Sequence, residues 1–261
     1  MSQHASRNMH RALITGGAGF IGSHLAEQLL AKDAWVTVID DLSTGNLDNL
    51  KAAQSNPRFK FIQAKVSACA DLPELAAEAD QIFHLAAAVG VELVVKSPVR
   101  VIETNLHETE VLLRAATACG TPVLLASTSE VYGKSAKEVF TEEDDLLIGP
   151  PTHARWSYAC SKLMDEFLAL AYAKERGLPV VIARLFNTVG PRQTGRYGMV
   201  LPRFIAAAQR GRAASCVWRR HPVALFLLCA GHRGGAAAAN VRPGGDGPDF
   251  QHWQHGGSFH C

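Results

Sequence analysis

The sequence predicts an α/β fold built on a doubly wound parallel sheet, with an incomplete C-terminal lobe. From residue 11 to about residue 208, short apolar segments alternate with longer amphipathic ones. The short segments are apolar on both faces, as strands covered by helices on both sides must be. This alternation predicts parallel strands, because each helix carries the chain back to the same edge of the sheet. After residue 213 neither pattern continues.

The predicted elements follow one another without a low-complexity linker. The strands are residues 11–15, 35–40, 59–62, 81–86, 122–128 and 179–186. The helices are residues 22–32, 101–118, 157–176 and 199–208. In the third helix apolar side chains recur at helical spacing, at Leu163, Phe167, Leu170 and Ala171. Residues 1–10 are polar and are expected to form a disordered tail, so one domain is predicted over residues 11–208.

The composition is ordinary for a globular protein and argues against several classes of partner. Of the 261 residues, 48% are hydrophobic and 19% are charged, and the formal net charge is +2. This balance gives no reason to expect binding to nucleic acid or to a membrane surface. The first ten residues lack the apolar run of a signal peptide. The six cysteines and the histidines show no metal-ligand spacing, so we expect free thiols, a cytoplasmic location and no metal site.

A glycine-rich turn follows the first predicted strand. In LITGGAGFIG, Gly16, Gly19 and Gly22 lie between the strand and the start of a helix. Glycines at such positions permit a tight turn, a close approach of the backbone to a pyrophosphate, and packing of the helix on the strand. The free N–H groups at the helix start then hold the phosphates. The sequence therefore predicts a dinucleotide site that includes Gly16, Gly19, Phe20, Ile21 and Gly22.

An acidic pair ends the second predicted strand. Asp40 lies 24 residues after Gly16 and is followed by Asp41. A carboxylate at this position accepts hydrogen bonds from the ribose hydroxyls and repels the 2′-phosphate of NADP. The pair therefore predicts NAD as the cofactor and a Rossmann-type sheet, with Asp40 favoured over Asp41 for the ribose contact.

Two further motifs carry reactive side chains. In YACSK, Tyr158 and Lys162 are four residues apart on one predicted helix, so the ammonium is expected to lie close to the phenol. A nearby positive charge is expected to lower the pKa of the tyrosine toward the working pH. In STSEVYG, at the carboxyl end of the fifth predicted strand, we expect Thr128 to hydrogen-bond a substrate hydroxyl and Glu130 to act as a second acid or base.

Together these motifs resemble the NAD-dependent epimerase/dehydratase family of extended short-chain dehydrogenases. This family includes nucleotide-sugar 4-epimerases, 4,6-dehydratases and UDP-glucuronate decarboxylases. The resemblance covers residues 11–208 and also rests on HLAA at 84–87 and RLFNTVGPRQ at 184–193. Within HLAA, it leaves His84 as a packing residue, since the family uses this stretch mainly for backbone contact with the cofactor.

The resemblance implies roles for several residues. The NAD site is expected to include Ala86, Tyr158 and Lys162, with the lysine on the nicotinamide ribose. The nucleotide-sugar substrate is expected to contact Ser129 and, at its diphosphate, Asn187. The resemblance also implies a homodimer.

The family's chemistry implies that Tyr158 removes the proton of the sugar 4-hydroxyl while hydride leaves C4 for NAD. The 4-keto sugar is then epimerised, dehydrated or decarboxylated, and the cofactor is regenerated. The Ser129-Glu130 pair is closer to the UDP-glucuronate decarboxylases than to the dehydratases. The sequence leaves open the outcome and the choice of UDP- or dTDP-sugar, and a reductase that releases NADH is a further alternative.

The segment after residue 208 follows a different pattern. Residues 213–261 contain no lysine and two acidic residues, Asp246 and Asp249. With the codons shifted by one base, CVWRRHPVALF at 216–226 can encode VYGDGTQSRCF, and FQHWQHGGSFHC at 250–261 can encode FNIGSTEEVSI. Both phrases look like this family, so residues 209–261 are interpreted as a frameshifted remnant of the substrate-binding lobe. The alternatives are a divergent extension and, for function, an inactive NAD-binding fragment.

Overall fold

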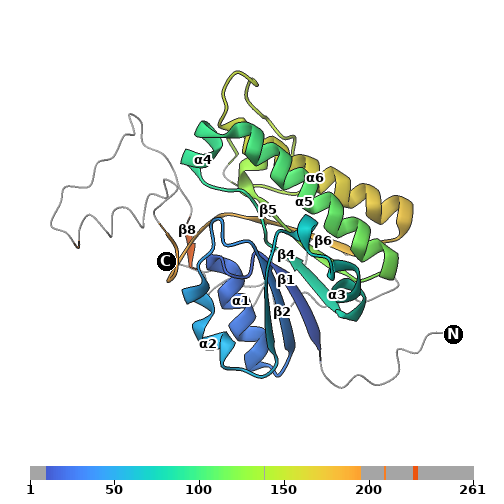
Figure 1. Cartoon of the computed structure of the whole chain (residues 1–261). Helices are drawn as coiled ribbons and strands as arrows, with labels where there is room; N and C mark the ends of the chain where they lie inside the picture. The colour runs from blue at the N-terminus through green and yellow to red at the C-terminus, as the bar shows by residue number, and fades with distance from the viewer. Residues whose placement is uncertain (1–9, 138, 195–208, 210–225, 229–261) are drawn as a thin grey trace.

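The computed structural model describes residues 10–137, 139–194, 209 and 226–228. This part of the chain contains a central sheet with helices on both faces (Figure 1). The predicted helix 199–208 lies outside the described residues, as does the predicted N-terminal tail apart from His10. The interpretation of residues 209–261 as a frameshifted remnant also falls almost wholly outside them.

The central sheet has six strands, all parallel to their neighbours. They are β1 (Arg11–Thr15), β2 (Trp35–Asp40), β3 (Phe59–Gln63), β4 (Gln81–His84), β5 (Val123–Thr128) and β6 (Val180–Leu185). Their order is β3-β2-β1-β4-β5-β6, which confirms the predicted doubly wound sheet. The order reverses between β1 and β4, and ligands of such sheets bind in the crevice outside the carboxyl ends at this point.

The helices connect these strands. The long ones are α1 (Phe20–Ala31), α5 (Pro98–Cys119) and α6 (Trp156–Arg176), and the short ones are α2 (Lys51–Gln54), α3 (Leu72–Glu78) and α4 (Val91–Lys96). Three 3₁₀ turns complete the set: η1 (Leu47–Leu50), η2 (Val66–Ala68) and η3 (Ser129–Tyr132). Among the described residues, no helix combines the length and apolar character that a membrane crossing requires.

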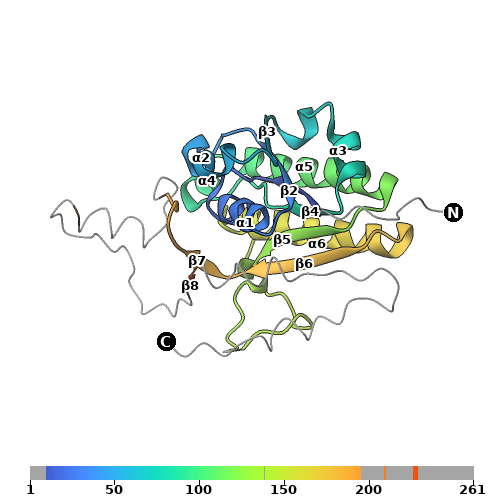
Figure 2. The same cartoon turned by 90° about the horizontal axis from the view of Figure 1, so that it is seen from below.

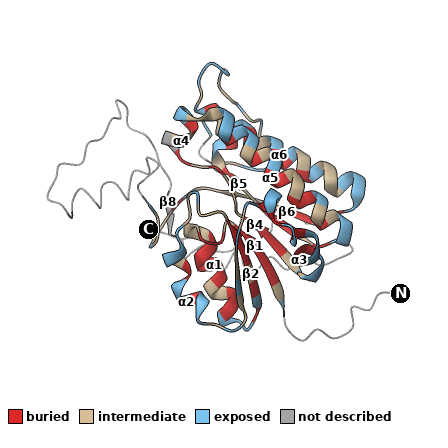
Figure 3. Cartoon of the chain, viewed as in Figure 1, coloured by how far each residue is buried: buried red, intermediate tan, exposed pale blue. Residues whose placement is uncertain are grey.

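The two faces of the sheet bury separate sets of apolar side chains, because successive residues of a strand point to opposite sides. Within β1, Leu13 packs in the cluster formed with α3, α5 and α6. Its neighbours Ala12 and Ile14 pack in the cluster formed with α1 and α2. Figure 3 shows buried residues along the strands and on the helix faces turned toward them. Burial on both sides explains why the strands are apolar throughout their length.

A second, two-stranded sheet follows β6. In it β7 (Asn187–Val189) pairs in parallel with β8 (Phe226–Leu228), with Asn187 opposite Phe226 (Figure 2). The sequence predicted no regular element beyond residue 213, and for Phe226–Leu228 that prediction is wrong. The physical reason is that a strand outside the main sheet, such as β7, offers unpaired backbone groups, with which a short apolar segment can form a ladder.

Candidate active site

The glycine loop lies between β1 and α1, at the point where the strand order reverses. Gly16 has a φ of +72° and donates its N–H to the carbonyl of Ile39, at 2.8 Å. A Cβ atom on Gly16 would lie 2.7 Å from the backbone nitrogen of Ala86, and one on Gly22 would lie 2.4 Å from the carbonyl oxygen of Gly16. These contacts leave no space for a side chain, so the turn requires glycine at both positions.

The first turn of α1 presents backbone donors. Its N-cap residue, Gly19, forms no side-chain capping hydrogen bond, and no acidic residue lies in the first turn. Phe20 and Ile21, the first two helical residues, are half-buried. The N–H groups of an uncapped first turn, together with the helix dipole, favour an anion such as a phosphate. The segment LITGGAGFIG therefore places the uncapped backbone donors of α1 beside the end of β1.

Asp40 lies at the carboxyl end of β2, beside this loop. Its Oδ2 atom accepts a hydrogen bond from the N–H of Ala18 at 2.9 Å, and its Oδ1 atom accepts one from the N–H of Leu42 at 2.8 Å. Burial raises the pKa of the Asp40 carboxyl, and these two hydrogen bonds oppose the rise. The Asp41 carboxylate instead accepts a hydrogen bond from the N–H of Ser43 at 2.9 Å. The geometry thus places Asp40 at the glycine loop and Asp41 next to it on the following turn.

The predicted reactive residues meet at the carboxyl end of β5. Thr128 is the last residue of this strand, and its hydroxyl lies close enough to the phenol of Tyr158, near the start of α6, to act on its pKa. The N–H of Glu130 donates to the same hydroxyl oxygen, Oγ1 of Thr128, at 3.2 Å. Ser129 is half-buried in η3 between them. Asn187 is exposed at the start of β7, beyond the end of β6.

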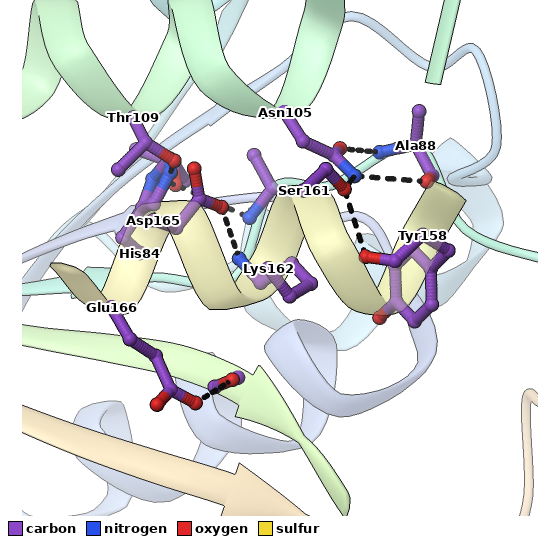
Figure 4. Close-up of polar contacts among 12 residues, drawn as sticks. His84, Ala88, Asn105, Thr109, Tyr158, Ser161, Lys162, Asp165 and Glu166 are labelled. Atoms are coloured by element: carbon purple, nitrogen blue, oxygen red, sulfur yellow. Dashed lines mark hydrogen bonds and ion pairs between the residues drawn. The ribbon is translucent and has the colours of Figure 1, made fainter. Parts of the chain in front are cut away.

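Helix α6 is fixed to the sheet by Glu166. Its carboxylate accepts a hydrogen bond from the hydroxyl of Ser127 on β5 and pairs with the guanidinium of Arg184 on β6, at 2.7 Å. Since Ser127 precedes Thr128, this contact sets the distance between the strand end and the helix that carries Tyr158. The Glu166–Arg184 pair is largely buried, and Figure 4 shows Glu166 directed toward β5.

The electrostatics of Tyr158 differ from the prediction. Burial raises the pKa of the phenol, and the carboxylates of Glu130 and Asp165 raise it further. The neighbouring Thr128 hydroxyl opposes the rise. The predicted lowering of this pKa by Lys162 is not found, and the Lys162 ammonium is paired with the Asp165 carboxylate at 2.7 Å.

Glu130 stays exposed at the end of β5. The protein around its carboxyl group raises its pKa by limiting hydration, and the nearby Arg155 guanidinium opposes that rise. A raised pKa brings a carboxylic acid closer to the working pH, as a proton donor or acceptor requires.

A polar network that the sequence analysis did not predict lies behind these residues. Asn105 on α5 accepts a hydrogen bond from the N–H of Ala88 at 2.7 Å and donates one to the hydroxyl of Ser161 at 3.0 Å. Ser161 in turn donates to the carbonyl of Tyr158 at 2.9 Å (Figure 4). These bonds tie both helices to the segment that follows β4. The available signal was a buried asparagine on the apolar face of an amphipathic helix.

Comparisons with known proteins agree with this geometry. The sequence model of the NAD dependent epimerase/dehydratase family matches residues 12–225. A UDP-N-acetyl-alpha-D-glucosaminuronate decarboxylase of Bacillus cytotoxicus is 44% identical over 202 residues, which cover 77% of this chain and 62% of the relative. The UDP-glucuronic acid decarboxylase 6 of Arabidopsis thaliana is 39% identical over 214 residues, 78% of this chain and 58% of the relative. The chain thus spans about three fifths of the length of these curated relatives.

A solved structure shares the fold. The UDP-glucuronic acid 4-epimerase from Bacillus cereus, in complex with UDP-glucuronic acid and NAD, superposes with a TM-score of 0.79 at 29% identity. The alignment covers 89% of this chain and 74% of the epimerase. NAD is the cofactor of the matched family. With the strand order, the glycine loop and the sequence match in agreement, the chain belongs to the NAD-dependent epimerase/dehydratase family.

Proposed function

We propose that this protein converts a nucleotide sugar through transient oxidation at C4. The observation that carries the proposal is the proximity of Thr128 and Tyr158 at the carboxyl end of β5, with Lys162 one turn further along α6. A sugar 4-hydroxyl placed against this pair has a base in Tyr158 and an orienting hydroxyl in Thr128. Glu130, with its raised pKa, is the candidate for a second acid or base.

The glycine loop and Asp40 support an NAD site that fits this chemistry. The uncapped first turn of α1 would hold the pyrophosphate, while the backbone of Ala86 borders the loop from the end of β4. The Asp40 carboxylate, fixed by two backbone donors, would accept the ribose hydroxyls. NAD, when bound, accepts hydride from C4 of the sugar. Lys162 would hold the nicotinamide ribose, and Ser129 and Asn187 would contact the substrate.

The substrate proposed is a UDP-linked uronic acid. The relatives by sequence include decarboxylases named for UDP-glucuronic acid, and one solved neighbour is a 4-epimerase bound to the same compound. Oxidation at C4 creates a ketone β to the C5 carboxylate, so that carboxylate can leave as carbon dioxide. If the carboxylate stays, return of hydride to the other face of C4 gives the epimer. Decarboxylation is the outcome we favour, because Ser129-Glu130 is closer to the decarboxylase pattern.

The test is to incubate the full chain and NAD with UDP-glucuronate and to measure carbon dioxide, the sugar product and NADH. We expect carbon dioxide and a UDP-pentose without net NADH, and a loss of about a hundredfold or more in Tyr158→Phe. A C4 epimer without carbon dioxide would indicate the epimerase instead. Accumulation of NADH would indicate a reductase. NAD binding with no conversion and no affinity for UDP- or dTDP-sugars would identify the alternative, an inactive NAD-binding fragment.

We also propose a homodimer formed through α5 and α6. Large apolar side chains are exposed on these helices, among them Val99, Ile102, Met164 and Phe167. Exposed apolar patches of this kind mark protein–protein contacts. Sedimentation equilibrium tests the proposal: a parent dimer that becomes a monomer in Phe167→Glu supports it, and a monomeric parent refutes it.

Two further proposals concern the chain as a whole. A cytoplasmic location fits the described cysteines Cys69, Cys119 and Cys160, which are free, and cell fractionation tests it.

Residues 209–261 are proposed to translate a shifted reading frame, so that the substrate lobe is incomplete. The support is the pair of family-like phrases in one shifted frame.

A further inference from the structure

Lys162 has a buried counter-ion. Its ammonium lies 2.7 Å from Oδ2 of Asp165, and the two side chains are 2% and 0% exposed. Asp165 follows three residues later on α6, so the two share one face of the helix. Removing one charge of such a buried pair leaves the other without compensation, so the two side chains hold each other in place.

Asp165 is in turn held by the neighbouring elements. Thr109 on α5 lies close enough to the Asp165 carboxyl to lower its pKa, and the Thr109 hydroxyl oxygen lies 3.1 Å from Nε2 of His84 on β4. The other ring nitrogen, Nδ1, lies 2.7 Å from the hydroxyl of Thr15, the last residue of β1. A neutral His84 protonated at Nε2 fits both of its contacts, because Thr15 can donate to Nδ1 and Nε2 can donate to Thr109. Figure 4 shows His84, Thr109 and Asp165 grouped on one side of α6.

The titratable groups around Tyr158 and Lys162 come from several elements. They are His84 on β4, Glu130 on η3, and Asp165 and Glu166 on α6. Burial and the Lys162 charge lower the pKa of His84 to about 3, so it is neutral. Glu166 is paired with Arg184. Asp165 is therefore the carboxylate whose charge acts directly on the ammonium, and it also raises the pKa of Tyr158.

We propose that Asp165 is a positioning residue for the Tyr158–Lys162 pair. Its carboxylate is the buried counter-ion that holds the Lys162 ammonium in place, and it reduces the effect of the ammonium charge on the Tyr158 phenol. Asp165 thereby adds to the effects of burial and of the Glu130 charge, which raise the pH at which Tyr158 loses its proton. This inference rests on the proposed role of Tyr158 as the base.

The test is the ionisation of Tyr158 in the full chain. Tyrosinate absorbance is followed against pH as the difference between each protein and its Tyr158→Phe counterpart. We expect Asp165→Asn to lower the pH of Tyr158 ionisation by at least about 1 unit, because the uncompensated ammonium then favours the phenolate. Asp165→Glu, which keeps the charge, is expected to restore the parent value. The control Glu175→Gln, an exposed position on α6, is expected to change nothing.

Two results would overturn the proposal: Tyr158 of Asp165→Asn ionises at the parent pH, or it does not ionise before the variant unfolds. If Asp165→Asn fails to fold, the urea midpoint of the double variant Asp165→Asn/Lys162→Met is compared with that of the parent. A double variant that folds with a midpoint near the parent value supports Asp165 as the counter-ion of Lys162, and a double variant that also fails to fold refutes it. Neither measurement needs turnover. Failure of the proposed function is seen separately, as a chain that leaves UDP-glucuronate unchanged.

Discussion

His84 is a buried titratable side chain with a defined protonation state. It is 1% exposed, lies at the end of β4, and sits between the hydroxyl groups of Thr15 and Thr109. The sequence predicted only packing at this position, and the structure adds a hydrogen-bonded connection between β1 and α5. Because burial and the Lys162 charge lower the pKa of the ring, the imidazole is neutral, so one ring nitrogen donates a hydrogen bond and the other accepts one.

The pH dependence of stability follows from this state. The folded pKa of His84 is lowered from 6.5 to about 3, so its contribution to stability is complete above pH 6.5 and is lost as the pH falls toward 3. Over this window the parent is expected to lose up to about 1.4 kcal/mol of unfolding free energy per pH unit relative to His84→Gln. Urea denaturation at several pH values measures the difference. His107→Gln, at an exposed position on α5, serves as the control, and an equal slope in both variants would contradict the assignment.

At the scale of elements, the turn between β1 and α1 depends on backbone space more than on side chains. Gly22 lies within α1, where a Cβ atom would be 2.4 Å from the carbonyl oxygen of Gly16. By contrast, Gly177 caps α6 with a φ of +69° and has no atom within 4 Å of an added Cβ. The two glycines are thus required for different reasons, packing in one case and backbone conformation in the other.

Alanine substitutions at Gly22 and Gly177 are therefore expected to have different effects. Gly22→Ala is expected to displace the loop, to lower stability by about 1–3 kcal/mol, and to weaken NAD binding by about tenfold or more. Gly177→Ala is expected to lower stability by roughly 1 kcal/mol through strain at positive φ and to leave NAD affinity unchanged. Calorimetric titration with NAD and urea denaturation measure both quantities. A Gly22→Ala chain with the parent affinity would show that the loop tolerates the side chain.

At the scale of the whole molecule, the segment after residue 208 is the feature to test. The family match extends over residues 12–225, and the chain reaches only about three fifths of the length of its curated relatives. The cofactor half has its own two-sided core, formed by residues before this segment. NAD binding is therefore expected even where the substrate lobe is incomplete.

Sequencing the gene across codons 200–220 on both strands tests the shifted frame. We expect one base to be missing or extra there, and restoring it is expected to give VYGDGTQSRCF in place of residues 216–226. The restored protein should then convert a nucleotide sugar. A read that confirms the present frame would make the segment a genuine extension, and the expectation would fall to NAD binding without turnover.

The sequence by itself determined the sheet and the main parts of the candidate site. Six strands and three long helices were predicted within a few residues, because apolar periodicity reports burial directly. The short elements α2, α3 and α4 were missed, since four to seven residues are too few to show a period. Gly16, Asp40 and Tyr158 were predicted because each belongs to a motif whose spacing is local.

Only the tertiary structure decided how these parts act on one another. Burial raises the pKa of Tyr158, and the charges of Glu130 and Asp165 raise it further, where the YxxxK spacing predicted a lower value. The hydrogen bonds of His84 join β1, β4 and α5, which are far apart in sequence. A linear pattern fixes which side chains a helix face carries, whereas desolvation and partner choice depend on what packs against that face.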